Sequence, residues 1–163
     1  GFTNIFSYKG FELNIFFQGS QGNDVFNGSR LFLESLQGGD NQLEVINDRW
    51  QQPGDITNIP AATNDPEQAA SNVWVSSRFI EDGSYLRLKN LTLGYNFHIG
   101  DRLKNSISGF RVYFTGQNLF TLTKYSGLDP EVNYRGNDNA VIGTDFFTFP
   151  QARIYSFGLN LTF

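Results

Sequence analysis

The residues with catalytic potential are few and far apart in the sequence. His98 is the only histidine and cysteine is absent, which excludes cysteine nucleophiles, disulfides and thiolate metal sites. A lone histidine in a short polar connection is typical of a solvated side chain, so Ser-His-Asp triads and paired-histidine metal sites have little support. Glu81-Asp82 and the pair Asp129 and Glu131 have the residue types of acid-base catalysis, but ordinary loop charge accounts for them. The sequence therefore predicts that the protein is not an enzyme.

Oxygen-rich side chains raise the separate question of a metal. Asp138 and Asp145 flank Asn and Gly residues, and such loops can hold calcium. The twelve-residue calcium-loop pattern is absent, as are dinucleotide and Walker motifs. No cofactor is expected, and calcium in the loops is the alternative.

Aromatic residues in the polar stretches are the best ligand candidates. Trp50, Trp74, Tyr125 and Tyr134 lie outside the alternating segments, where loops carry function and rings stack on sugar faces. The alternative is that these rings pack the loops or contact a partner protein.

Residues 153–163 alternate without interruption, with Ser156, Gly158, Asn160 and Thr162 on one face of the expected strand. The opposite face is apolar and consists of Tyr155, Phe157, Leu159, Leu161 and Phe163. A bilayer-spanning strand of about ten residues needs such faces, since one side meets lipid and the other the barrel lumen. The segment also resembles the C-terminal assembly signal of bacterial outer-membrane proteins, which implies that Phe163 acts in assembly.

Alternation elsewhere completes an all-β prediction of five antiparallel strands, at about 2–8, 11–19, 78–97, 110–122 and 152–163. Lys9-Gly10 is expected to form a two-residue hairpin turn. Leu86 and Leu88 have the phase opposite to Leu91, so either a bulge near Lys89-Asn90 resets the register or this part projects beyond the bilayer. The residues expected to face lipid are Phe11, Leu13, Ile15, Phe17, Leu91, Leu93, Tyr95, Val112, Phe114, Phe157, Leu159 and Leu161.

The connections differ in length in a regular way. Lys9-Gly10 and 98–108 are short, whereas 19–77 and 123–150 are long and polar. This asymmetry is typical of outer-membrane barrels, which have short periplasmic turns and long extracellular loops. Most acidic residues lie in or beside the long connections, so the net charge of −4 is a property of that surface and argues against nucleic acid as a partner.

Five strands cannot close a membrane barrel, because an open edge in lipid leaves backbone groups unpaired. The sequence therefore predicts that the rest of the same barrel is the first partner.

Three long strings resemble the C-terminal end of SusC/RagA-type TonB-dependent transporters: residues 77–95, 110–131 and the closing strand to Phe163. Residues 19–24 and 47–50 also fit this family, so the resemblance covers nearly the whole chain. It implies residues 1–163 of a plugged outer-membrane barrel of about 22 strands, whose plug and TonB-contacting segment precede this chain.

The resemblance also implies a function. The family imports glycans or peptides with TonB energy, together with a SusD-like surface lipoprotein that acts as a lid. An alternative is that the segment is bound as a client or subunit of an assembly or secretion complex, with its terminal strand paired to a partner's edge.

Overall fold

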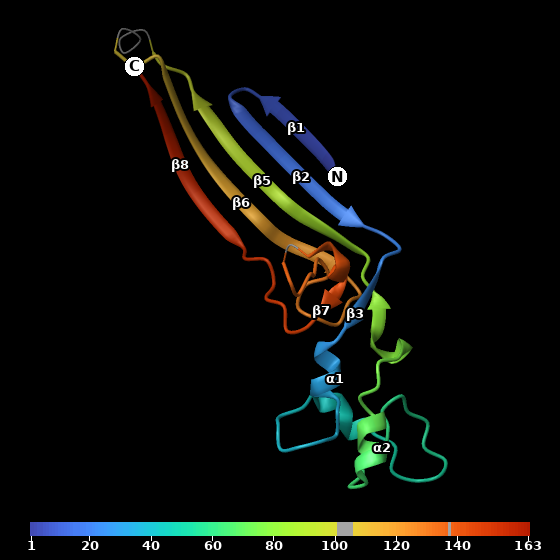
Figure 1. Cartoon of the computed structure of the whole chain (residues 1–163). Coiled ribbons are helices and arrows are strands. Elements are labelled where there is room, and N and C mark those ends of the chain that lie inside the picture. Colours follow the sequence, from blue (N-terminus) through green and yellow to red (C-terminus); the bar gives the residue numbers. More distant parts are fainter. Residues whose placement is uncertain (101–105, 137) are drawn as a thin grey trace. The chain divides into compact units, whose positions relative to one another are not determined.

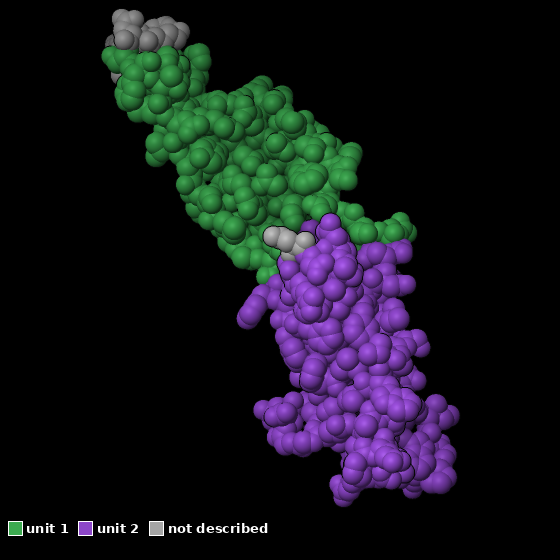
Figure 2. Space-filling view, viewed as in Figure 1, with its two compact units in different colours: residues 1–21, 84–124, 150–163 green, residues 22–83, 125–149 purple. Residues whose placement is uncertain are grey.

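The computed structural model of the chain describes residues 1–100, 106–136 and 138–163. They form two compact units, coloured separately in Figure 2. Unit 1 contains residues 1–21, 84–124 and 150–163, and unit 2 contains residues 22–83 and 125–149. The alternating segments thus lie mainly in unit 1, and most of the two long polar connections lies in unit 2.

Unit 1 is a five-stranded antiparallel sheet with the order β1-β2-β5-β6-β8 (Figure 1). Lys9 and Gly10 both have positive φ, 46° and 88°, which is the requirement of a two-residue type I′ turn and confirms the predicted hairpin. The strands are β1 (Phe2–Tyr8), β2 (Phe11–Ser20), β5 (Tyr85–Phe97), β6 (Gly109–Thr123) and β8 (Ile154–Thr162).

The register aligns the alternating residues of neighbouring strands. Phe11 pairs with Tyr95, Tyr95 with Val112, and Val112 with Leu159. Directly paired residues share a face of a sheet, so one face is apolar across β2, β5, β6 and β8. The opposite face carries polar or small residues, including Asn14, Thr92, Thr115 and Ser156 in one row.

A bulge explains the phase reversal seen in the sequence of β5. The pairing of β5 with both neighbours shifts at Lys89, between Leu88 and Asn90. The extra residue returns Leu88 and Leu86 to the face of Leu91, which confirms the first of the two alternatives, a bulge near Lys89-Asn90.

Unit 2 is built from short elements supplied by both long connections. Its three-stranded sheet has the order β4-β3-β7, with β3 antiparallel to β4 and parallel to β7. Since β3 and β7 come from different connections, unit 2 combines residues of both connections. The elements are β3 (Asp24–Asn27), α1 (Ser29–Leu33), η1 (Glu44–Asp48), α2 (Pro66–Ser71), η2 (Ser77–Phe79), β4 (Ile80–Asp82), η3 (Asn139–Val141) and β7 (Thr144–Asp145).

Two sequence predictions need correction here. The strand predicted at 78–97 is split, because Ile80–Asp82 pairs with β3 in unit 2 and β5 begins only at Tyr85. Gly83 lies at the break, where a Cβ would lie 2.5 Å from the Val25 side chain. The long connections, predicted as polar loops, also contain short helices and strands. The short connection expected at 98–108 lies partly outside the described residues, at 101–105.

The interior of unit 2 combines apolar and polar side chains. Val25, Tyr125 and Val132 form a buried cluster, and Phe79 and Ile59 are also buried.

Among the helices of the described residues, none is long and apolar enough to cross a membrane.

Candidate functional site: the surface and interior of the loop unit

Unit 2 contains buried ion pairs around Glu34, whose side chain is 2% exposed. Arg30 approaches Glu34 through Nε at 2.5 Å and Nη2 at 3.1 Å. Arg78 Nη2 lies 3.3 Å from the same carboxylate, and its guanidinium stacks 4.5 Å from the Phe79 ring centroid. Such bidentate contacts fix geometry as well as charge, so Glu34 holds α1 against the segment around η2.

Glu81 joins the two long connections. Its carboxylate accepts hydrogen bonds from Arg30 Nη1 at 3.0 Å and Asn27 Nδ2 at 3.1 Å, both in the first connection. From the second connection, the backbone N–H and the hydroxyl of Ser126 donate to it at 2.8 Å. Glu81 is therefore a structural centre of unit 2.

The contacts of Glu81 and Arg30 shift the pKa values of both side chains. Burial alone raises the pKa of Glu81, but the hydrogen bonds from Ser126, Arg30 and Asn27 lower that pKa below its ordinary value. The hydrogen bond to Glu34 raises the pKa of Arg30 further, against the opposing effect of burial. Glu81 and Arg30 thus remain charged over the neutral range.

Tyr125 and Asp145 form a second buried pair. The Tyr125 hydroxyl donates to Asp145 Oδ2 at 2.7 Å, and the Thr148 N–H donates to Oδ1 at 3.0 Å. Burial, and then the Asp145 carboxylate, raises the pKa of Tyr125. Tyr125 is only 5% exposed, so it packs the unit interior, the alternative that the sequence left open for these rings.

The other aromatic candidates reach the surface of unit 2. Trp74, after α2, is 69% exposed, and Trp50, after η1, is 40% exposed. Tyr134 stacks edge-on against Phe146 at 5.2 Å, with the Arg135 guanidinium 5.4 Å from its ring. Exposed rings of this kind can stack on a ligand, and substrate contact by Trp50, Trp74 and Tyr134 stays a prediction.

The remaining acidic candidates have local structural partners. Asp129 is buried and its Oδ1 accepts the Glu131 N–H at 2.9 Å. Asp138 Oδ1 accepts the Ala140 N–H at 3.0 Å. Within residues 1–100, 106–136 and 138–163, no group of three or more His, Cys, Asp or Glu side chains is placed to hold a metal ion.

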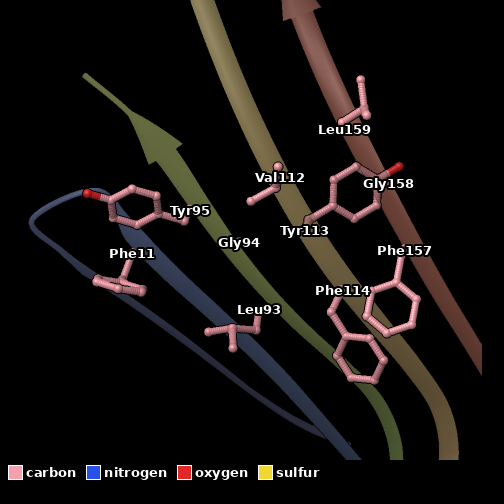
Figure 3. Close-up of a pocket in the computed structure, with 10 residues that line it drawn as sticks. All are labelled: Phe11, Leu93, Gly94, Tyr95, Val112, Tyr113, Phe114, Phe157, Gly158 and Leu159. Carbon is pink, nitrogen blue, oxygen red and sulfur yellow. The ribbon is translucent and has the colours of Figure 1, made fainter. Parts of the chain in front are cut away.

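The apolar face of unit 1 contains a shallow groove of about 570 Å³. Figure 3 shows rings and aliphatic side chains from β2, β5, β6 and β8 around it, including Phe11, Leu93, Val112 and Phe157. Phe114 and Phe157 pack at 5.0 Å between ring centroids. An apolar face that remains uncovered across several strands is suited to lipid contact.

The polar face of unit 1 carries a charged group. Arg111 Nη2 lies 2.8 Å from Glu12, which also accepts from Asn96 Nδ2 at 2.8 Å. Gly94 leaves room for the Arg111 guanidinium, which would lie 2.9 Å from an added Cβ. Gly158 likewise leaves room for the Tyr113 ring. Close side-chain packing thus explains these two glycines.

The expected assembly residues lie on and just after β8. Phe163 follows the strand and, like the four residues before it on the same face, is exposed. The apolar residues of this face are Tyr155, Phe157, Leu159, Leu161 and Phe163.

The sequence reasoning missed the ion pairs of unit 2. The spacing of Arg30 and Glu34, four residues apart, was a readable signal for a helical pair. Arg78 and Asn27 offered no such signal, because their partners are distant in the sequence.

No protein-family model matches the chain. Along its whole length it is 38% identical over 167 residues to TonB-dependent receptor P3 of Formosa agariphila and 30% identical over 164 residues to TonB-dependent receptor SusC of Bacteroides thetaiotaomicron. It spans 16% and 15% of those proteins.

Two solved structures also match nearly the whole chain. A chain in a structure of the RagAB peptide transporter matches 96% of this chain with a TM-score of 0.75 and 31% identity, over 16% of that chain. The RagAB peptide importer in a "closed-closed" state matches 99% of this chain with a TM-score of 0.73 and 30% identity, over 17% of that chain.

Proposed function

We infer that this chain, whose sequence and fold are those of a segment of a SusC/RagA-type TonB-dependent receptor, forms part of the barrel wall of an outer-membrane nutrient importer. The observation that carries this inference is the register of unit 1, which aligns one apolar and one polar face across neighbouring strands. A wall between lipid and an aqueous lumen requires those two faces.

We further propose that the whole protein works with partners outside this chain. The rest of the barrel would pair with the free edges of β1 and β8, since open edges are not tolerated in lipid. A plug and a TonB-contacting segment would supply gating and energy. Unit 2, with Trp50 and Trp74 exposed, would lie outside the cell and meet the nutrient and a SusD-like lipoprotein. The nutrient class proposed is a glycan or a peptide.

We assign Phe163 to assembly. Its ring continues the apolar face of β8 toward the periplasmic interface, where aromatic girdles lie. The barrel assembly machinery would recognise this strand as an unpaired edge. Deleting Phe163 should lower the amount of folded barrel, measured by heat-modifiable gel mobility, while uptake per folded molecule stays unchanged. Normal folding with lost uptake would overturn this assignment.

Import can be tested on the complete receptor in outer membranes. Cells with and without the gene, matched for the partner lipoprotein, would be given fluorescent neutral oligosaccharides and oligopeptides. Uptake should depend on the gene and stop when a protonophore collapses the proton gradient. Equal uptake without the gene, for every compound tried, would contradict the proposal.

A further inference from the structure

The groove of about 570 Å³ on the apolar face of unit 1 has a shape that the import function does not require. Two pairs of rings border it: Tyr95 packs on Phe11 at 4.5 Å, and Phe114 on Phe157 at 5.0 Å between ring centroids. Figure 3 shows smaller aliphatic side chains between and beside these pairs. The aliphatic residues of the lining are Leu93, Val112 and Leu159.

The register of the strands produces this shape. In one row of the sheet, Val112 pairs directly with Tyr95 and with Leu159. In the next row, toward the long connections, Leu93 pairs with Phe114. Valine is the smallest side chain in either row, so the face dips at Val112, between the rings of Tyr95 and Phe114. The groove is thus written into the sequence of the strands and does not depend on a loop.

The lining is suited to hydrocarbon. It contains no charged side chain, and its side-chain hydrogen-bonding groups are two tyrosine hydroxyls. Its apolar side chains remain accessible, since Phe157 is 83% and Leu159 67% exposed. A polar ligand would lose hydrogen bonds to water in such a groove without replacing them. An acyl chain loses none, and it contacts rings on both sides and aliphatic groups at the base.

A cation lies at the short-turn end of this face. Lys9 is exposed in the turn between β1 and β2, and its Nζ lies 5.2 Å from the centroid of the Tyr8 ring. Tyr8 pairs directly with Phe11, so its ring shares the apolar face with the groove. The cation–π contact therefore holds the ammonium on the same side of the sheet as the groove.

These two features together match an amphipathic anion. Phe11 lines the groove and begins β2 directly after the Lys9-Gly10 turn, so the groove starts at the end of the sheet where the proposed wall meets the membrane surface. Lysine side chains extend to that surface and attract anionic headgroups. A phosphate at Lys9 would therefore be joined to a chain that enters the groove.

We propose that this groove binds one phospholipid of the leaflet at the short turns, with an acyl chain between the two pairs of rings and the phosphate at the Lys9 ammonium. The proposal rests on the barrel-wall assignment made under the proposed function, and it names a lipid partner of that wall. Import of a nutrient does not require it.

The test uses the complete receptor in detergent, with a phosphatidylglycerol that carries a photoreactive diazirine in the middle of one acyl chain. Peptide mapping after illumination locates the cross-linked residues. Cross-links should concentrate in residues 91–97, 110–114 and 157–161, above the level at Leu86 and Leu122, which pair with each other on the same face. An even distribution over the apolar face would overturn the site, as would receptor dimers joined through this face.

Val112→Trp should fill the groove and lower the cross-linking of residues 157–161 about tenfold, as the loss of one well-packed contact predicts. Leu122→Trp is the matched control, because Leu122 lies on the same strand and face, is 61% exposed and is outside the lining. It should leave cross-linking unchanged. Heat-modifiable mobility selects folded molecules of both variants, and an equal loss in both would contradict the site.

Lys9→Gln tests the headgroup without changing the groove. It should lower cross-linking by phosphatidylglycerol about two- to fivefold, the range for one exposed ion pair. Cross-linking by a diacylglycerol with the same diazirine, which lacks the phosphate, should not change. Lys124→Gln, at an exposed lysine directly after β6, is the control. Equal losses for both lipids, or in both variants, would overturn the role of Lys9.

The same measurements separate this site from the import function. A receptor that imports, with cross-links spread evenly over its apolar face, removes only the lipid site. A receptor cross-linked in the groove that imports nothing removes only the import function. Cross-links confined to the opposite, polar face would overturn the assignment of faces on which both rest.

Discussion

The two units of this chain are stabilised by different kinds of interaction. In unit 1, backbone pairing aligns side chains that mostly stay at least partly exposed on both faces, as the proposed wall between lipid and lumen requires. In unit 2, short elements are joined by buried charges and hydrogen bonds around Glu34, Glu81 and Asp145. Unit 1 is therefore held by backbone pairing between long strands, whereas unit 2 is held by buried side-chain contacts among short elements.

The largest loss of stability is expected from Glu34→Ala. Removing the carboxylate leaves Arg30 and Arg78 without their buried partner, which should destabilise unit 2 by about 3 to 5 kcal/mol. Amide hydrogen exchange of the complete receptor should then accelerate in α1, β3 and β4, but not in the sheet of unit 1. Glu67→Ala, at an exposed glutamate of α2, is the control. Equal acceleration in both units would mean that they are not separately stabilised.

The converse change is Leu159→Arg on the apolar face of unit 1. A charge near the bilayer midplane on the lipid side should cost about 2 to 4 kcal/mol. The folded fraction in membranes, read by heat-modifiable mobility, should fall, while exchange in unit 2 of the folded molecules stays normal. Ser156→Arg on the opposite face should be tolerated, and equal losses from both variants would contradict the assignment of faces.

The sequence predicted unit 1 well, because a period of two is visible in the residues themselves. Even the bulge at Lys89 was readable, since it reverses the phase between Leu88 and Leu91. Unit 2 was not predictable in this way. Its strands are too short for alternation to appear, and Arg30 meets Glu81 across 51 residues.

The aromatic ligand candidates also show what the sequence pattern does not predict. Trp74 is 69% exposed, whereas Tyr125 lies in the interior, where Asp145 accepts its hydroxyl hydrogen bond. Sequence position in a polar stretch therefore indicates a loop, but it does not distinguish an exposed ring from one that packs the loop.

A smaller effect is expected from Tyr125→Phe, which keeps the ring and removes one buried hydrogen bond. Asp145 retains the Thr148 N–H as a donor, so the loss should be about 1.5 to 3 kcal/mol, the range for a bond to a charged group. Exchange should accelerate around β7 and β3. An unchanged rate there would mean that apolar packing, and not this pair, orders the centre of unit 2.

Glu81→Gln should cost about 1.5 to 3 kcal/mol at neutral pH, because it removes the charge and replaces one acceptor oxygen with an NH2 group that faces the donors around Glu81. The informative measurement is the pH dependence. Because hydrogen bonds lower the pKa of Glu81 in the folded state, its stabilisation is complete above the ordinary carboxyl pKa and is lost as pH falls through the lower, folded value. Exchange rates in β3 and β4, corrected for intrinsic chemistry, should therefore rise on acidification in the wild type and rise less in Glu81→Gln. An identical acid response in both proteins would show that another carboxylate controls the order of unit 2.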